Sequence, residues 1–186
     1  MAGVRKGDKK SLITVSSAAA IFIAVLIVII SAFSVGGEKK AAEKVLKAVS
    51  KNDAQSVVKL VPKFFYSPNI IGVTQTEEDW LGIFDERIET FRNLASDKLE
   101  SEDFTMSWEI TDVDFYGENE LKTLTEVFEI YEEFKDKKLK KGALVNVEVV
   151  CKRGGEKYFS EFEVYVYKYG SSWYVQKWAD VASVQN

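Results

Sequence analysis

The chain of 186 residues has no histidine and only one cysteine, Cys151. Without histidine, Ser-His-Asp and Cys-His nucleophilic catalysis are excluded, and the commonest proton shuttle and metal ligand near neutral pH is missing. A single cysteine cannot form a disulfide within the chain, so the fold must be held by its hydrophobic core. Because Cys151 lies among alternating apolar residues, we expect a small buried hydrophobe rather than a reactive thiol.

Charge is also missing from one long stretch, Leu12 to Val35. As a helix this stretch is about 36 Å long, enough to cross a hydrocarbon core of about 30 Å. It therefore predicts a transmembrane helix that contacts the lipid bilayer. The alternative is a secretory signal cleaved near Ala32-Phe33-Ser34, which leaves a secreted protein, but signal cores usually have only about 7 to 15 apolar residues.

The charges that flank this stretch predict its orientation. Residues 1–11 have a charge of +3, from one acid, Asp8, against four cations: Arg5, Lys6, Lys9 and Lys10. By the positive-inside rule this short tail stays in the cytoplasm, and residues 36–186 form an extracytoplasmic domain at the cell membrane. Since the whole chain has a net charge of −4, that domain carries −7. An acidic domain argues against nucleic acid as a partner.

Apolar residues recur at helical spacing in four segments after this stretch. The expected helices cover residues 38–51, 53–62, 76–99 and 118–139. Asn52 is suited to a left-handed turn that ends the first helix, and Asp53 to capping the second. Thr76 and Asp79 have the spacing of a capping box at the start of the third.

Apolar and polar residues alternate in four other segments, which predicts strands at 104–115, 143–152, 157–169 and 172–184. The alternation changes phase at Thr111-Asp112, which predicts a β-bulge that bends the first strand. Gly154-Gly155 is suited to the positive φ angles of a two-residue hairpin turn, and Tyr169-Gly170-Ser171-Ser172 predicts the second reversal. The sequence therefore predicts the α+β class, with helices packed on one face of a curved antiparallel sheet.

A helix corner at Lys51-Asn52-Asp53 and a closing hairpin strand around Tyr169-Gly170-Ser171-Ser172-Trp173 complete this order. With these features the chain, over residues 38–186, resembles the nuclear transport factor 2-like, or cystatin-like, superfamily. The resemblance implies a cone-like sheet wrapped around a long helix. The long helix at 76–99 departs from it, because many members pass sooner into a hairpin.

The layout of tail, span and external domain also resembles two groups of membrane-tethered proteins. These are surface proteins and lipoproteins of Gram-positive bacteria, and scaffold subunits of type IV secretion or conjugation machines. Enzymes of the superfamily hold an acidic general base with Tyr, His or Asp donors inside the cone. No Asp of this chain aligns with such a position, and no calcium-loop spacing occurs among its acids. We therefore expect a non-enzymatic protein without a metal or cofactor.

The last two strands carry the candidate binding residues. Tyr165, Tyr167 and Tyr169 share one face of the third strand, whereas Phe162, Val164 and Val166 share the other. The same alternation places Tyr174 and Trp178 on the tyrosine side. Two interpretations fit this face, ordinary cross-strand pairs and a surface for a partner or ligand.

Our prediction is a binding or assembly module whose sheet face contacts a protein partner or an envelope component through Tyr165, Tyr167, Tyr174 and Trp178. The alternative is a small-ligand site or an enzyme site inside the cone.

Overall fold

The computed structural model of the chain describes residues 36–66, 76–129, 134 and 138–180. The chain divides into two units, Met1–Gly36 and Gly37–Asn186, and the helices and strands below all belong to the second. The expected span, Leu12 to Val35, and residues 181–184 of the expected last strand lie outside the described residues. Within the described ranges, no helix is long and apolar enough to cross a membrane.

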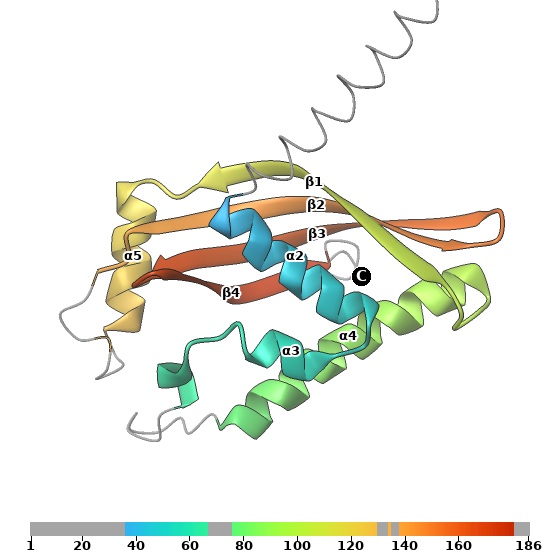
Figure 1. The fold of residues 1–186 in the computed structure, drawn as a ribbon, viewed down its shortest axis with the longest axis horizontal. Coiled ribbons are helices and arrows are strands. Elements are labelled where there is room, and N and C mark those ends of the chain that lie inside the picture. The colour runs from blue at the N-terminus through green and yellow to red at the C-terminus, as the bar shows by residue number, and fades with distance from the viewer. Residues whose placement is uncertain (1–35, 67–75, 130–133, 135–137, 181–186) are drawn as a thin grey trace, which may run out of the picture. The chain divides into compact units, whose positions relative to one another are not determined.

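The elements follow the predicted order of helices and strands (Figure 1). The helices are α2 (Gly37–Ser50), α3 (Ala54–Val58), α4 (Glu77–Leu99) and α5 (Glu118–Phe128), with a 3-10 turn, η1 (Lys63–Tyr66). The strands are β1 (Thr105–Phe115), β2 (Lys141–Arg153), β3 (Glu156–Tyr169) and β4 (Ser172–Asp180). They form one antiparallel sheet in the order β1-β2-β3-β4. The predicted α+β class is confirmed.

Helix starts coincide with the predicted capping residues. Asn52 has a φ of +54°, and the Asp53 carboxylate accepts a hydrogen bond from the Ser56 N–H at 3.0 Å. Thr76 and Asp79 cap α4 reciprocally. The Asp79 N–H donates to Thr76 Oγ1 at 3.1 Å, and the Thr76 N–H donates to Asp79 Oδ2 at 2.7 Å. Both predicted caps are confirmed.

The predicted helix at 118–139 is wrong in its second half, because α5 ends at Phe128. The Leu139 N–H donates to Thr125 Oγ1 at 3.4 Å. In a continuous helix these residues are about 21 Å apart, so Thr125 and Leu139 do not belong to one continuous helix. Residues 130–133 and 135–137 of the expected helix lie outside the described residues. Phe134 and Leu139 are buried beside α5. Their apolar spacing therefore reflects packing against this helix rather than its continuation.

The larger hydrophobic core lies between α2, α3 and α4 and one side of the sheet, which we call the helix face. Strand residues on this face include Val145, Val147, Val164 and Val166, all 2% exposed or less. From α4 the core receives one stripe of buried residues: Phe84, Ile88, Phe91, Ala95 and Leu99. Cys151 is fully buried on the same face, as predicted.

Irregularities in the strands occur near their predicted places. The pairing of β1 with β2 shifts between Ile110 and Asp112, which confirms the predicted bulge. The hairpin between β2 and β3 turns at Gly154-Gly155, and of these two only Gly154 has a positive φ, +57°. Gly170, between β3 and β4, has a φ of +62°. The predicted hairpins are confirmed, although the first needs one left-handed glycine rather than two.

The Thr76–Asp79 cap makes stability depend on pH. Hydrogen bonds from the backbone and then the side chain of Thr76 lower the pKa of Asp79 from its ordinary 3.8. A carboxylate with a lowered pKa in the folded state contributes stability that is fully present above the ordinary value, and that is lost as pH falls through the folded value. In urea unfolding across this range, Asp79→Asn should therefore remove part of the acid-dependent loss of stability.

The matched control is Asp85→Asn, on the exposed side of the same helix. It removes one carboxylate from the same helix and leaves the Thr76–Asp79 cap intact, so the acid-dependent loss of stability that comes from the cap should remain. If Asp79→Asn and the unaltered chain show the same pH dependence, the cap does not contribute in this way.

Candidate functional site

Residues of β3 alternate between the two sides of the sheet, as predicted. Val164 and Val166 lie on the helix face, so Tyr165 and Tyr167 lie on the opposite side, which we call the tyrosine face. Tyr174 is paired with Tyr167 across the strands and therefore shares that side. The predicted placement of these three tyrosines is confirmed, while their role in binding stays a prediction.

The prediction that Trp178 shares the tyrosine face is wrong. Strand β4 slips by one position relative to β3, because Gln176 is an extra residue between Val175 and Lys177. One extra residue reverses the side on which the following side chains point. Trp178 therefore points into the helix-face core, where its ring stacks on Phe162 with the ring centroids 5.2 Å apart.

Helix α5 covers one end of the tyrosine face, so the prediction that the helices pack on one face of the sheet is wrong: the apolar Tyr167 needs cover on this side as well. Tyr167 is 0% exposed, and its ring centroid lies 4.9 Å from that of Phe128 on α5. Tyr174 is half-buried and stacks on Tyr167 at 6.1 Å. They belong to a second core: Phe64, Leu124, Phe128, Phe134, Leu139 and Tyr167, with Tyr174 packed against it. For Tyr167 and Tyr174 the interpretation as ordinary packing holds.

An open groove of about 550 Å³ lies where α5 leaves the tyrosine face uncovered. Its lining is mostly apolar and comes from three parts of the chain. Strand β3 contributes Tyr165, and β4 contributes Gln176 and Lys177. The rest comes from α5 and from Tyr116 in the connection between β1 and α5: Tyr116, Asn119, Glu120, Thr123, Leu124 and Val127. Of the four predicted site residues, the groove therefore includes Tyr165 alone.

Tyr165 is held in place by one contact at its hydroxyl and one over its ring. Its hydroxyl donates a hydrogen bond to Glu163 Oε2 at 2.7 Å, and Lys177 Nζ lies 4.3 Å from the ring centroid. The bond to the carboxylate, with burial and the charge of Glu163, raises the pKa of Tyr165 to about 12. Its phenol is therefore protonated at neutral pH. The ring forms an amphipathic wall of the groove, with the Lys177 ammonium group over it.

Tyr116 forms the other aromatic wall. Its backbone N–H donates to the Gly142 carbonyl oxygen at 2.9 Å, and its ring lies directly over that glycine. Burial, followed by the charges of Tyr165 and Glu120, raises the pKa of Tyr116 to about 12. This phenol is also neutral near pH 7. Neither tyrosine of the groove is thus a ready general base at that pH.

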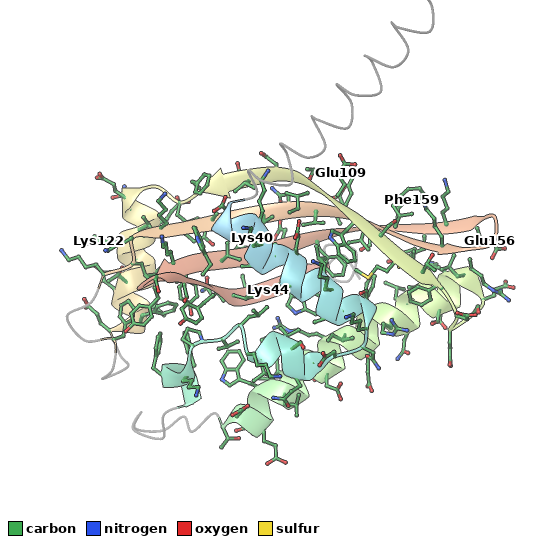
Figure 2. All side chains as sticks on the ribbon, in the orientation of Figure 1. Lys40, Lys44, Glu109, Lys122, Glu156 and Phe159 are labelled. Carbon is green, nitrogen blue, oxygen red and sulfur yellow. The ribbon has the colours of Figure 1, made fainter. Side chains whose placement is uncertain are left out.

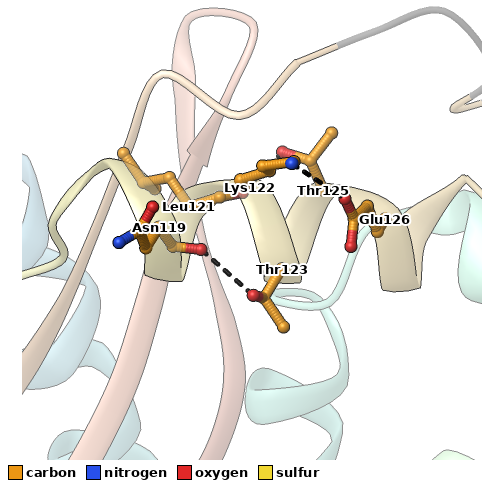
Figure 3. A network of polar contacts seen from close by, with 6 residues as sticks. All are labelled: Asn119, Leu121, Lys122, Thr123, Thr125 and Glu126. Atoms are coloured by element: carbon orange, nitrogen blue, oxygen red, sulfur yellow. Dashed lines mark hydrogen bonds and ion pairs between the residues drawn. The ribbon is translucent and has the colours of Figure 1, made fainter.

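The polar groups of α5 are mostly used within the helix itself (Figure 3). Thr123 Oγ1 donates to the Asn119 carbonyl at 3.0 Å, and Thr125 Oγ1 donates to the Leu121 carbonyl at 2.7 Å. Lys122 and Glu126 form an ion pair at 3.8 Å on the exposed side. Since the hydroxyls are engaged in the helix, α5 offers the groove mainly the apolar surface of Leu124 and Val127, the latter 52% exposed.

Three acids of the chain have structural partners. Asp79 caps α4, the Asp112 carboxylate accepts from the Val113 N–H at 2.8 Å, and the Asp114 carboxylate accepts from Asn146 Nδ2 at 3.2 Å. Among the described residues, no group of three or more Cys, Asp or Glu side chains is placed to hold a metal ion. The arrangement at the groove is suited to binding an amphipathic surface.

Sequence reasoning missed most of the groove, and one signal pointed to it. Gly142 is the one glycine within strand β2, and an isolated glycine in a strand indicates that another group approaches closely. That group is the ring of Tyr116. The bulge at Gln176 left no such signal. Gln176 and Lys177 are both polar, so the alternation of apolar and polar residues does not show that one of them is an extra residue.

Comparison of the chain with protein-family models, with curated proteins and with solved structures finds no match.

The Tyr116 wall depends on the absence of a side chain at position 142. A Cβ atom there would lie 2.3 Å from Tyr116 Cδ2, closer than any van der Waals contact allows. We expect Gly142→Ala to lower the free energy of unfolding by about 1–3 kcal/mol, in the range of overpacked sites. Chemical denaturation measures this change.

Gly155→Ala is the control, because a Cβ at that position meets nothing within 4 Å and the backbone φ there is not positive. It should be nearly neutral. If both substitutions are equally tolerated, Tyr116 is not held against Gly142.

Proposed function

We propose that this chain is a single-pass, membrane-anchored, non-enzymatic binding module outside the cytoplasm, and that the groove beside α5 binds a segment of a protein partner. The observation that carries the proposal is the open, mostly apolar groove of about 550 Å³ around Tyr165. Contiguous exposed apolar surface of this kind is typical of an interaction site.

The composition of the groove favours a protein segment as the bound group. Tyr165 and Tyr116 form rigid aromatic walls, and Val127 adds exposed apolar surface to the lining. Tyrosine is enriched at protein interfaces because it combines a large apolar area with one polar group. An apolar side chain of the partner fits against these walls, while Lys177 and Glu120 supply charged groups at the groove for polar contacts.

The membrane anchor in this proposal is supported by the uncharged stretch Leu12 to Val35 and by the basic tail before it. We also propose the finer assignment, a cone-like fold of the nuclear transport factor 2-like type, with the layout of a surface protein or of a secretion or conjugation scaffold. Its support is the order of elements and the bulged β1 at the edge of a sheet that packs against α2 and α4.

A small-ligand site, enzymatic or not, is the second candidate. The volume of the groove falls within the range of about 300–1,000 Å³ that small-molecule sites occupy. The open form of the groove favours a protein segment over an enclosed small molecule, and the two functions give different results in the experiment that follows.

Substitutions in the groove should remove the partner. Full-length protein is purified from solubilised membranes, and co-purifying proteins are quantified for the unaltered chain, Tyr165→Ala and Val127→Glu. We expect each variant to retain roughly a tenth or less of the partner, because contacts at the centre of an interface commonly contribute about 2 kcal/mol. The matched control is Phe159→Glu, which alters another exposed apolar residue, 65% exposed and outside the groove lining.

Retention of the partner by Tyr165→Ala and Val127→Glu contradicts the proposal. A small molecule that raises the melting temperature of the unaltered chain, but not of Tyr165→Ala, supports the second candidate instead.

The anchor is tested by the state of the N-terminus. We expect the native protein to stay in the membrane pellet after an alkaline wash and to keep its N-terminal residues, as intact-mass spectrometry measures. A soluble product that begins after Ala32-Phe33-Ser34 indicates a cleaved signal and contradicts the anchor.

A further inference from the structure

Helix α2 carries a stripe of lysines on the side that faces away from the core. Lys40, Lys44 and Lys47 of α2, and Lys51 directly after its last residue, follow one another at steps of three or four residues, and all four are exposed (Figure 2 labels Lys40 and Lys44). Residues at this spacing share one side of a helix. The opposite side of α2 is buried: Ala41, Ala42, Val45, Leu46, Ala48 and Val49. The lysine stripe is thus a continuous basic surface.

Nearby acids balance little of this charge. Among the residues that the structure describes, Lys47 has one ion-pair contact, with Glu43 at 4.0 Å, and Lys40 and Lys44 have none. Residues 37–51 contain five lysines and two glutamates, within a domain whose net charge is −7. Lys44, Lys47 and Lys51 also line a hollow of about 240 Å³ beside α3, to which Asp53 contributes one carboxylate near Lys51. The stripe is therefore a local exception in an acidic domain.

The tyrosine face, on the other side of the sheet, carries a row of acids in addition to the cation Lys177. Glu109 is paired with Glu148, and Glu148 is paired with Glu161, so three carboxylates lie in one row across β1, β2 and β3. Like charges in directly paired positions repel one another. The domain therefore has a basic side at α2 and an acidic side at this row, and an anionic surface attracts the first and repels the second.

We propose that the lysine stripe of α2 docks the domain on the anionic phospholipid headgroups of the membrane in which the chain is anchored. The proposal rests on the proposed anchor. The expected span ends at Val35 and Lys40 follows five residues later, so the stripe begins within about 18 Å of chain from the span. The remaining lysines follow along a helix that is only about 21 Å long.

At this distance the headgroups are at a high effective concentration, and each lysine that reaches them strengthens association roughly fivefold. Docking through α2 turns the sheet so that the tyrosine face and its groove point away from the bilayer. The groove is then accessible to a partner that approaches from the aqueous phase.

Amine labelling of the full-length chain tests the docking. The chain is reconstituted into vesicles of phosphatidylcholine, with or without phosphatidylglycerol, and lysine acylation is followed residue by residue by mass spectrometry. In the anionic vesicles the labelling rates of Lys40, Lys44, Lys47 and Lys51 should fall roughly fivefold or more. Lys122 and Lys157, exposed on α5 and β3, serve as internal controls and should not change. High salt should restore the rates.

A pair of variants separates docking from general effects of an anionic vesicle. Lys40→Glu with Lys44→Glu should abolish the protection of Lys47 and Lys51. Lys122→Glu with Lys157→Glu, which changes the net charge equally, should leave it intact. Equal labelling of the stripe in both kinds of vesicle, or protection that survives the first pair, overturns the proposal. Flotation of the chain with neutral vesicles tests the anchor separately, so its failure is distinguishable from failure of the docking.

Discussion

Val166 and Tyr167 are neighbours on β3 that point to opposite sides of the sheet, and both are almost completely buried. This requires apolar cover on both sides of the same strand. Helices α2, α3 and α4 supply it on the helix face, and α5 with the segment around Phe64 supplies it on the tyrosine face. The position of α5 follows from this constraint, since an uncovered Tyr167 leaves a large apolar area in water.

The cover on the tyrosine face is incomplete, and the groove is the consequence. Tyr165 lies two residues before Tyr167, at the point where the surface buried by α5 gives way to the open part of the sheet. The bulge at Gln176 adds to the same place by turning Lys177 towards Tyr165 instead of into the core. Without that extra residue, Lys177 would point into the helix-face core and Trp178 would lie on the tyrosine face. The bulge thus places Trp178 in the helix-face core and Lys177 at the groove.

The two sides of the domain differ in charge as well as in packing. Repulsion within the row of Glu109, Glu148 and Glu161 is moderated by exposure to water, which allows the sheet to keep three paired carboxylates. The lysines of α2 are likewise exposed at no cost to the core, because a helix packs through one side only. The proposed binding through the groove and the proposed docking through α2 use different surfaces, so neither requires the other to change shape.

Local patterns determined much of the fold. Caps at Asp53 and Thr76, the stripe of α4 and the phase change at Thr111-Asp112 depend on neighbours within a few residues, and their predictions are confirmed. The sequence alone did not determine where α5 ends, that it covers Tyr167, or that Trp178 faces the helices. The first two depend on contacts with distant segments, such as Leu139 with Thr125. The third depends on a bulge between polar residues, where the alternation of hydrophobicity carries no information about the side on which a residue lies.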